Sequence, residues 1–130
     1  MNDYVVYNIK NHILICRQHG YAIQCDGVGR HFRTFHKSTS LQTRNALTEY
    51  AKSLDLWDVD RVLNNHDGSF IEGLTVDNGY KCQYEVCQQL RGTVDSIRKH
   101  CNDAHSWTTL QEICWKKQAY QTIFNGLHLR

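Results

Sequence analysis

The feature that most constrains this chain is a set of four metal-binding side chains near its middle. Two cysteines with four residues between them are followed, after twelve residues, by two histidines with the same spacing: Cys82, Cys87, His100 and His105. Two thiolates on a short turn and two imidazoles near a helix end can complete a tetrahedral shell around Zn²⁺. Because four protein ligands leave no open coordination position, the pattern predicts a structural zinc site.

A second set of four ligands lies upstream, with gaps of two, eleven and four residues: Cys16, His19, His31 and His36. Histidine takes the place of the second cysteine, which is chemically acceptable because neutral imidazole binds zinc well. Cys25 is a competing ligand that could replace His19 through a local rearrangement. The two-residue gap before His19 is the tighter geometry and favours His19. The two sets together predict two Zn²⁺ ions per chain.

The cysteine content fits metal binding in a reducing compartment. The six cysteines of this 130-residue chain are interleaved with histidines at ligand spacing, which argues against a disulfide framework. Cys25, Cys101 and Cys114 are left over, and we expect them to be small buried hydrophobes. We expect no membrane span and no secretory signal at the start, since no apolar run is long enough. Neither a membrane nor a small-molecule substrate is therefore an expected partner.

The order of apolar and polar residues predicts an α+β fold in one small zinc-stabilised domain over residues 1–130. Two C2H2-like ββα fingers are expected to pack around a helical spacer, since the spacer has a core pattern of its own. The predicted parts are finger one at about 10–37, the spacer at 38–77, finger two at about 78–105, and a C-terminal docking segment at 106–130.

Individual elements follow from local patterns. Strands are predicted at 4–7 and 12–15, a strand-like run at 70–76, and helices at 27–37, 41–54, 59–64 and 93–104. Asp77, Asn78 and Gly79 predict a turn, because these residue types favour turns. The stretch after Trp107 is compatible with a helix or with an irregular docking segment. Trp57, Trp107 and Trp115 are expected to be core anchors.

Charge along the chain indicates a nucleic-acid-binding surface on the first finger. Residues 10–37 carry five basic side chains and one acidic one, whereas residues 38–80 carry three basic and seven acidic ones. In a zinc finger of this type, the helix residue just before the first histidine can reach the DNA bases. Arg30 and Lys99 occupy this position in the two fingers, so they are candidate guanine or phosphate contacts. Arg33, Lys37 and Arg98 are candidate phosphate contacts. These side chains predict binding to duplex DNA. They favour contacts to the DNA phosphate backbone over sequence-specific contacts to the bases.

The alternative is a module that binds another protein. An acidic middle and 14 aromatic residues in 130 are compatible with a partner surface. We expect no enzymatic activity, because both predicted metal sites are fully ligated and no catalytic motif is evident.

Several short segments resemble one family across residues 10 to 124. They are the finger segments ICRQHGYAIQ and HFRTFHK, the amphipathic TRNALTEYAKSLDL, then IEGLTVDNGYKC, and a final SW with KKQAYQTIF. Together they resemble the fungal orsellinic-acid-cluster protein D family, in which cysteine usually stands where this chain has His19. The resemblance implies zinc and a nuclear, nucleic-acid setting, and it implies no known activity.

Overall fold

The computed structural model describes residues 3–84, 87, 89–125 and 127–129. Contacts within the chain divide it into two compact units. Unit 1 combines residues 1–75 with residues 121–129, and unit 2 spans residues 76–120. The mixed α+β class predicted from the sequence is confirmed. Whether the chain unfolds as the single domain expected from the sequence stays a prediction.

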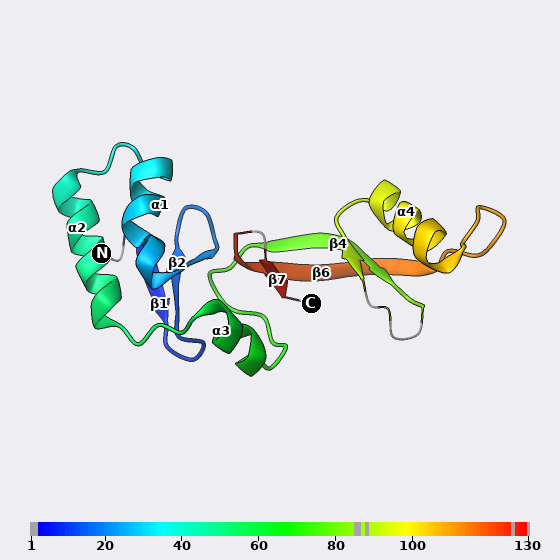
Figure 1. The fold of residues 1–130 in the computed structure, drawn as a ribbon, viewed down its shortest axis with the longest axis horizontal. Coiled ribbons are helices and arrows are strands. Elements are labelled where there is room, and N and C mark those ends of the chain that lie inside the picture. The colour runs from blue at the N-terminus through cyan, green and yellow to red at the C-terminus, as the bar shows by residue number, and fades with distance from the viewer. Residues whose placement is uncertain (1–2, 85–86, 88, 126, 130) are drawn as a thin grey trace. The chain divides into compact units, whose positions relative to one another are not determined.

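Unit 1 opens with three short strands and continues with helices (Figure 1). Its elements are β1 (Val5–Asn8), β2 (Ile13–Cys16), β3 (Ala22–Ile23), the 3-10 turn η1 (Cys25–Gly27), α1 (Val28–Phe35), α2 (Leu41–Ser53) and α3 (Val59–Asn65). Two C-terminal strands, the end of β6 (Trp115–Phe124) and β7 (Leu127–Leu129), complete it. The β1 and β2 strands form an antiparallel hairpin, β3 follows antiparallel to β2, and Ala22 pairs in parallel with Phe124.

Side-chain caps explain where the two spacer helices begin. The Ser40 hydroxyl accepts a hydrogen bond from the Thr43 amide, and an Asp58 carboxylate oxygen accepts one from the Arg61 amide. Both caps satisfy amide groups that have no partner inside the helix. The predicted helices at 41–54 and 59–64 are therefore present, with their ends shifted by one residue.

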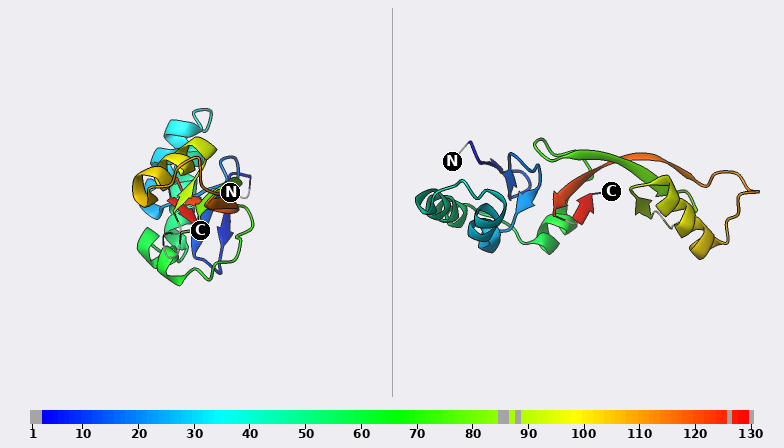
Figure 2. Two further views of the ribbon diagram at one scale, coloured as in Figure 1. Left: turned by 90° about the vertical axis from the view of Figure 1, so that its right-hand side faces the viewer. Right: turned by 90° about the horizontal axis from the view of Figure 1, so that it is seen from above.

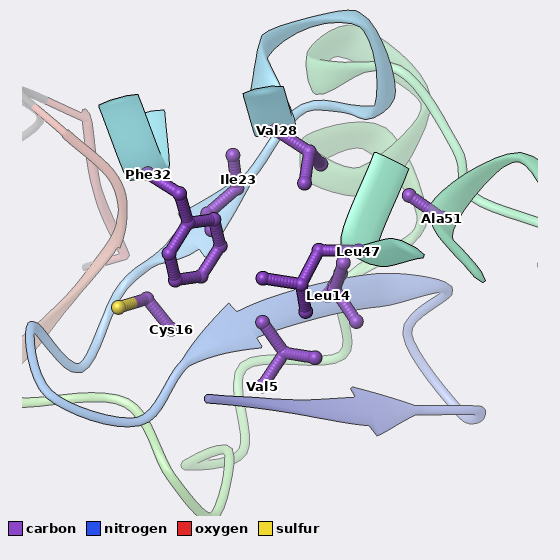
Figure 3. Packing of buried hydrophobic residues seen from close by; sticks show 8 residues of the cluster. All are labelled: Val5, Leu14, Cys16, Ile23, Val28, Phe32, Leu47 and Ala51. Atoms are coloured by element: carbon purple, nitrogen blue, oxygen red, sulfur yellow. The ribbon is translucent and has the colours of Figure 1, made fainter. Parts of the chain in front are cut away.

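The first core of unit 1 lies between the β1–β2 hairpin and the helices α1 and α2 (Figure 3). Phe32 on α1 and Leu47 on α2 are fully buried together with Leu14 from β2. Cys16 belongs to the same cluster, so the first thiol ligand is held by the core that supports α1.

A second core of unit 1 ties the C-terminal strand to the spacer. Ile123 and Phe124 of β6 are buried with Ile15, Val62 and Ile71. Gln121, only 1% exposed, fixes this arrangement through its side-chain amide. Its Oε1 accepts from the Ile71 amide at 2.7 Å, and its Nε2 donates to the Ile71 carbonyl at 2.7 Å. The buried amide is thus satisfied by backbone groups 50 residues away in sequence.

Unit 2 is a small sheet with one helix against it. It contains β4 (Val76–Cys82), β5 (Leu90–Arg91), α4 (Val94–His105) and the start of β6, with β4 between β5 and β6. The α4 helix contacts β4 and β5 (Figure 2). Four buried residues form its core: Cys82, Ile97, Cys101 and Trp107. No helix in the described part of the chain is long and apolar enough to cross a membrane.

Three local predictions are wrong. The strand-like run predicted at 70–76 contains a turn and a bend, and no strand begins there before Val76. From Trp115 on, the segment after Trp107 forms the strands β6 and β7, because its backbone pairs with the distant strands β3 and β4 and then folds back on itself. The turn predicted at 77–79 lies inside β4. Gly79 serves close packing there, since a Cβ atom would lie 2.7 Å from the Arg91 carbonyl oxygen and 2.9 Å from Tyr120 Cε1.

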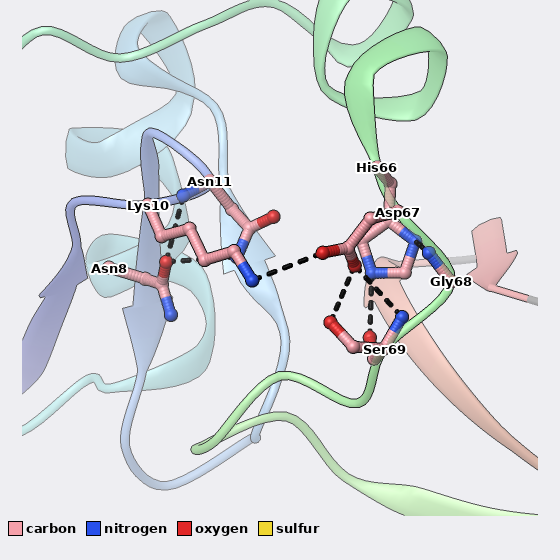
Figure 4. A network of polar contacts seen from close by, with 7 residues as sticks. All are labelled: Asn8, Lys10, Asn11, His66, Asp67, Gly68 and Ser69. Atoms are coloured by element: carbon pink, nitrogen blue, oxygen red, sulfur yellow. Dashed lines mark hydrogen bonds and ion pairs between the residues drawn. The ribbon is translucent and has the colours of Figure 1, made fainter.

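A polar network closes the loop after α3 in unit 1 (Figure 4). The Asp67 carboxylate accepts hydrogen bonds from the amide and hydroxyl of Ser69 and pairs with Lys10 Nζ at 3.1 Å. His66 Nδ1 accepts from the Gly68 amide at 3.1 Å, which shapes the same turn. The Ser69 hydrogen bonds, with Lys10 adding to them, hold the pKa of Asp67 well below its usual range.

Asp67→Asn is expected to flatten the acid limb of the stability profile of the protein. A lowered pKa in the folded state stabilises the fold at pH values above about 4, where the unfolded carboxyl ionises, and the contribution fades as pH falls further. Chemical denaturation between pH 6 and pH 2 measures this, with Glu72→Gln as a control that removes another exposed carboxylate of unit 1. Parallel profiles for the wild type and Asp67→Asn below about pH 4 would contradict the assignment.

Candidate metal centres

The first predicted ligand set comes together in unit 1. One ligand atom from each of Cys16, His19, His31 and His36 lies within 4.8 Å of every other. Cys16 Sγ is 3.4 Å from His19 Nδ1 and 3.4 Å from His36 Nε2, and the Nε2 atoms of His31 and His36 are 3.2 Å apart. The four side chains can therefore hold one metal ion.

A tight turn places the first two ligands. Cys16 ends β2, its carbonyl accepts from the Gly20 amide at 2.8 Å, and its own amide donates to the Tyr21 carbonyl at 2.9 Å. Gly20 has φ +70°, a left-handed conformation that favours glycine, and a Cβ atom there would collide with Thr75 Oγ1. The chain thus turns back within a few residues, which leaves His19 beside Cys16.

The end of α1 places the other two ligands. His31 lies in the helix, which ends at Phe35, and His36 leaves it with φ −128° and ψ 62°. The buried Thr39 holds this end, because its hydroxyl donates to the carbonyl of His36 and its amide donates to the same oxygen. The unwound end brings the His36 ring opposite His31 despite the four residues between them.

Burial favours the neutral form of two histidines of the first centre, His31 and His36. His31 is almost fully buried, and this burial, with the nearby charges of His36 and His19, lowers its pKa to about 4. The pKa of His36 is lowered as well, mainly by burial. Only the neutral imidazole ring can bind a metal, so both rings are in the binding form at neutral pH.

The second ligand set comes together in unit 2. Ligand atoms of Cys82, Cys87, His100 and His105 also lie within 4.8 Å of one another. Cys82 ends β4, and Cys87 follows in a turn where its amide donates to the Tyr84 carbonyl at 2.8 Å. Cys87 Sγ is 3.2 Å from His100 Nε2.

One observation in unit 2 fits a metal ion directly. His105 Nε2 is buried and has no hydrogen-bond partner among the described residues. A buried polar atom without a partner is costly, and a metal ion at this nitrogen removes the cost. The His105 ring is held by stacking on Tyr84, with ring centroids 4.2 Å apart and planes at 12°.

Aromatic side chains that sequence reasoning missed support both centres, Phe32, Phe35 and Tyr84 among them. Tyr84 stacks on His105, and Phe35 packs on His19 and His31 with ring centroids 5.6 and 5.3 Å apart. The sequence indicates this role only through their closeness to the ligands: Tyr84 is two residues after Cys82, and Phe35 is one residue before His36.

The spare cysteines have different environments. Cys101 is buried as expected, with its Sγ 4.0 Å from Cys82 Sγ, and burial raises the pKa of its thiol. Cys114 is half-buried. Cys25 is exposed in η1, so its predicted burial is wrong. Cys25 also lies outside the first ligand cluster, which contains His19.

The candidate DNA contacts lie on the surface of both units. Arg30 and Arg33 are exposed on α1, and the exposed Lys37 follows its end. None of these three forms an ion pair with any residue in the described ranges. On α4, by contrast, Arg98 pairs with Asp95 at 3.5 Å and Lys99 with Asp103 at 3.9 Å. The structure thus brings together the predicted metal ligands of each centre. It leaves the cations on and just after α1 without an ion pair among the described residues.

These features define a small α+β protein with two four-ligand Cys/His clusters, each able to hold a metal ion. The family model for orsellinic acid/F9775 biosynthesis cluster protein D matches residues 3–106. The chain belongs to this family, as its sequence motifs predict. No curated protein and no solved structure matches it.

Proposed function

We propose that this protein is a zinc-dependent nucleic-acid-binding module that binds duplex DNA through its finger helices. The observation that carries the zinc assignment is the spacing of the ligand atoms. With Zn–S near 2.3 Å and Zn–N near 2.0 Å, neighbouring ligands of a tetrahedral zinc lie about 3.5 Å apart for S and N and about 3.3 Å for N and N. In the first centre the corresponding distances are 3.4 and 3.2 Å.

The ligand chemistry supports zinc in a structural role. Mixed thiolate and imidazole sets of four suit Zn²⁺, whereas harder ions prefer oxygen ligands. Two such ions would be bound per chain, one by each cluster. Since four protein ligands leave no position for water or substrate, we propose that neither ion is catalytic and that the protein is not an enzyme.

The free cations on α1 favour this helix as the main DNA contact. Arg30, Arg33 and Lys37 are exposed without acidic partners among the described residues, so their charges are available to phosphates. Arg98 and Lys99 of α4 are secondary contacts, because each already has a carboxylate nearby on its own helix. A nuclear location accords with a DNA-binding role and is part of the proposal.

Replacing Arg30, Arg33 and Lys37 together by alanine is expected to weaken duplex binding and to lower its salt slope by about one unit for each lost phosphate contact. Fluorescence anisotropy of a labelled duplex at several salt concentrations measures the slope. A triple variant at Lys52, Lys116 and Lys117, which are exposed elsewhere on the surface, removes the same charge and should keep the slope. An unchanged slope in the α1 variant, with both metals still bound, would contradict the proposal.

One observation favours the second candidate, a protein-interaction module. Leu110 is 96% exposed and Ile113 68% exposed on the loop after α4. The loop is braced by Trp107 Nε1 donating to the Glu112 carbonyl at 2.8 Å and by Gln111 Oε1 accepting from the Thr108 amide at 2.8 Å. A braced loop with exposed apolar side chains suits a partner surface. The same titration separates the candidates, because a protein module shows no salt-dependent duplex binding to weaken.

A further inference from the structure

We propose that a groove beside the first metal centre binds an unpaired nucleobase, so that this protein prefers nucleic acid with an unpaired base over a fully paired duplex. The inference rests on the proposed nucleic-acid function and adds a ligand class to it. The groove lies within unit 1, between α1, β3 and the end of β6, and has a volume of about 440 Å³. This volume falls in the range of pockets that take small organic ligands.

The groove has aromatic surfaces suited to stacking. Phe35 and Tyr21 line it, and Ile23 and Phe124 add apolar surface. Phe35 is 54% exposed although it packs on the rings of two predicted metal ligands. The rings of His19 and His31 hold Phe35 in place, and its exposed part is available for stacking. Unpaired bases bind proteins mainly by stacking on such rings, and every base has a suitable face.

The charges around the groove separate the base from the phosphates. Asp26 and Arg30 both line it, which supplies an acceptor and a donor for the edge of a base. The carboxylate of Asp26 disfavours a phosphate inside the groove, because like charges repel. Arg33 and Lys37 do not line it. They are free for phosphates at its border, since Arg33 is three residues from Arg30 on the same helix.

The spacing along α1 explains how one helix serves both roles. Gly27, Arg30, His31 and Thr34 line the groove, and they recur at the intervals that place residues on one helix face. Arg30 thus lines the groove and is also a neighbour of Arg33 on the helix surface. Gly27 lies at the N-terminal end of this face with φ −103°, and a Cβ atom there meets no other atom within 4 Å. Since Gly27 lines the groove and its Cβ position is open, a larger side chain there can be introduced at the groove wall without a clash at the Cβ atom.

The test compares two labelled duplexes that differ only in one unpaired thymine, bound to zinc-replete protein at one salt concentration. The wild type is expected to bind the duplex with the unpaired thymine about tenfold more tightly, which corresponds to stacking of one base. Phe35→Ala and Gly27→Leu should each remove this preference, and Gly27→Leu should leave affinity for the paired duplex unchanged. Phe70→Ala is the matched control, because Phe70 is 62% exposed in unit 1 and lies outside the groove.

The possible outcomes separate the two proposals. Equal affinity of the wild type for both duplexes overturns the proposal that the groove binds a base, and it leaves the proposed duplex binding intact. A preference that survives both Phe35→Ala and Gly27→Leu overturns it as well. If neither duplex binds, the proposed nucleic-acid function fails and the groove proposal fails with it. Metal content is measured for each variant. Should Phe35→Ala lose zinc, Gly27→Leu decides, since a Cβ atom at Gly27 meets no other atom within 4 Å.

Discussion

A chain in which Cys87 is replaced by alanine is expected to bind one metal ion instead of two and to lose the fold of unit 2. A structural zinc contributes about 10–16 kcal/mol to units of this kind, which are unfolded without it. The core of unit 2 contains four buried residues, and one of them, Cys82, is itself a ligand. So small a core cannot offset the loss of the metal.

Unit 1 is expected to keep its metal and its fold in the Cys87→Ala variant. Its four ligands, its two cores and the Gln121 hydrogen bonds all lie within unit 1. Elemental analysis gives the metal ratio, and hydrogen exchange of β2 and of β4 reports on the two units separately. Cys114→Ala is the control, since Cys114 is a half-buried thiol of unit 2 outside the ligand cluster. Loss of protection in β2 would show instead that the chain is the single cooperative domain predicted from the sequence.

Replacement of His19 by alanine is expected to remove the metal from the first centre, whereas Cys25→Ala should leave two metals per chain. The expectation follows from position: His19 Nδ1 lies 3.4 Å from Cys16 Sγ, while Cys25 is exposed in η1 and outside the cluster. Loss of one of four ligands also opens the site to water and to exchange. His19→Cys, unlike His19→Ala, should keep the metal in the first centre, because thiolate is the ligand that zinc prefers in such sites.

The measurement is the number of zinc ions that remain after dialysis against a weak chelator. Co²⁺ substitution gives an independent reading, since the absorption of the bound ion changes when a sulfur or nitrogen ligand is exchanged. If Cys25→Ala lowers the zinc ratio to one and His19→Ala does not, the chain rearranges around η1 and the ligand assignment from the structure is wrong.

Much of both centres could be predicted from the sequence because their ligands are close in the chain. The gaps between Cys82 and Cys87 and between His100 and His105 reflect a turn and a helix end, which are local geometries. The helices were predictable for the same reason, since caps such as Thr93 act on amides three residues away. Both predicted ligand clusters form in the structure.

The features that could not be predicted depend on residues far apart in the chain. The strand β6 follows from pairing between Phe124 and Ala22 and from the contacts of Gln121 with Ile71, 50 residues away. The sequence predicts a turn at Gly79, whereas its actual role is to leave room for Arg91 and Tyr120, partners that the sequence does not reveal. The exposure of Cys25 likewise depends on how η1 meets α1, which no periodic pattern records.

The strand β6 also sets an order of events during synthesis. Unit 1 is built from residues 1–75 and 121–129, with all of unit 2 made between them. While the nascent chain is still on the ribosome, residues 76–120 emerge before Gln121, Ile123 and Phe124 are available to cover Ile71 and Val62. The amide of Ile71 and the apolar surface around it therefore stay uncovered until residues 121–124 have been made. A chain that ends at residue 106, where the family match ends, would contain all eight ligands and still lack the strand that closes unit 1.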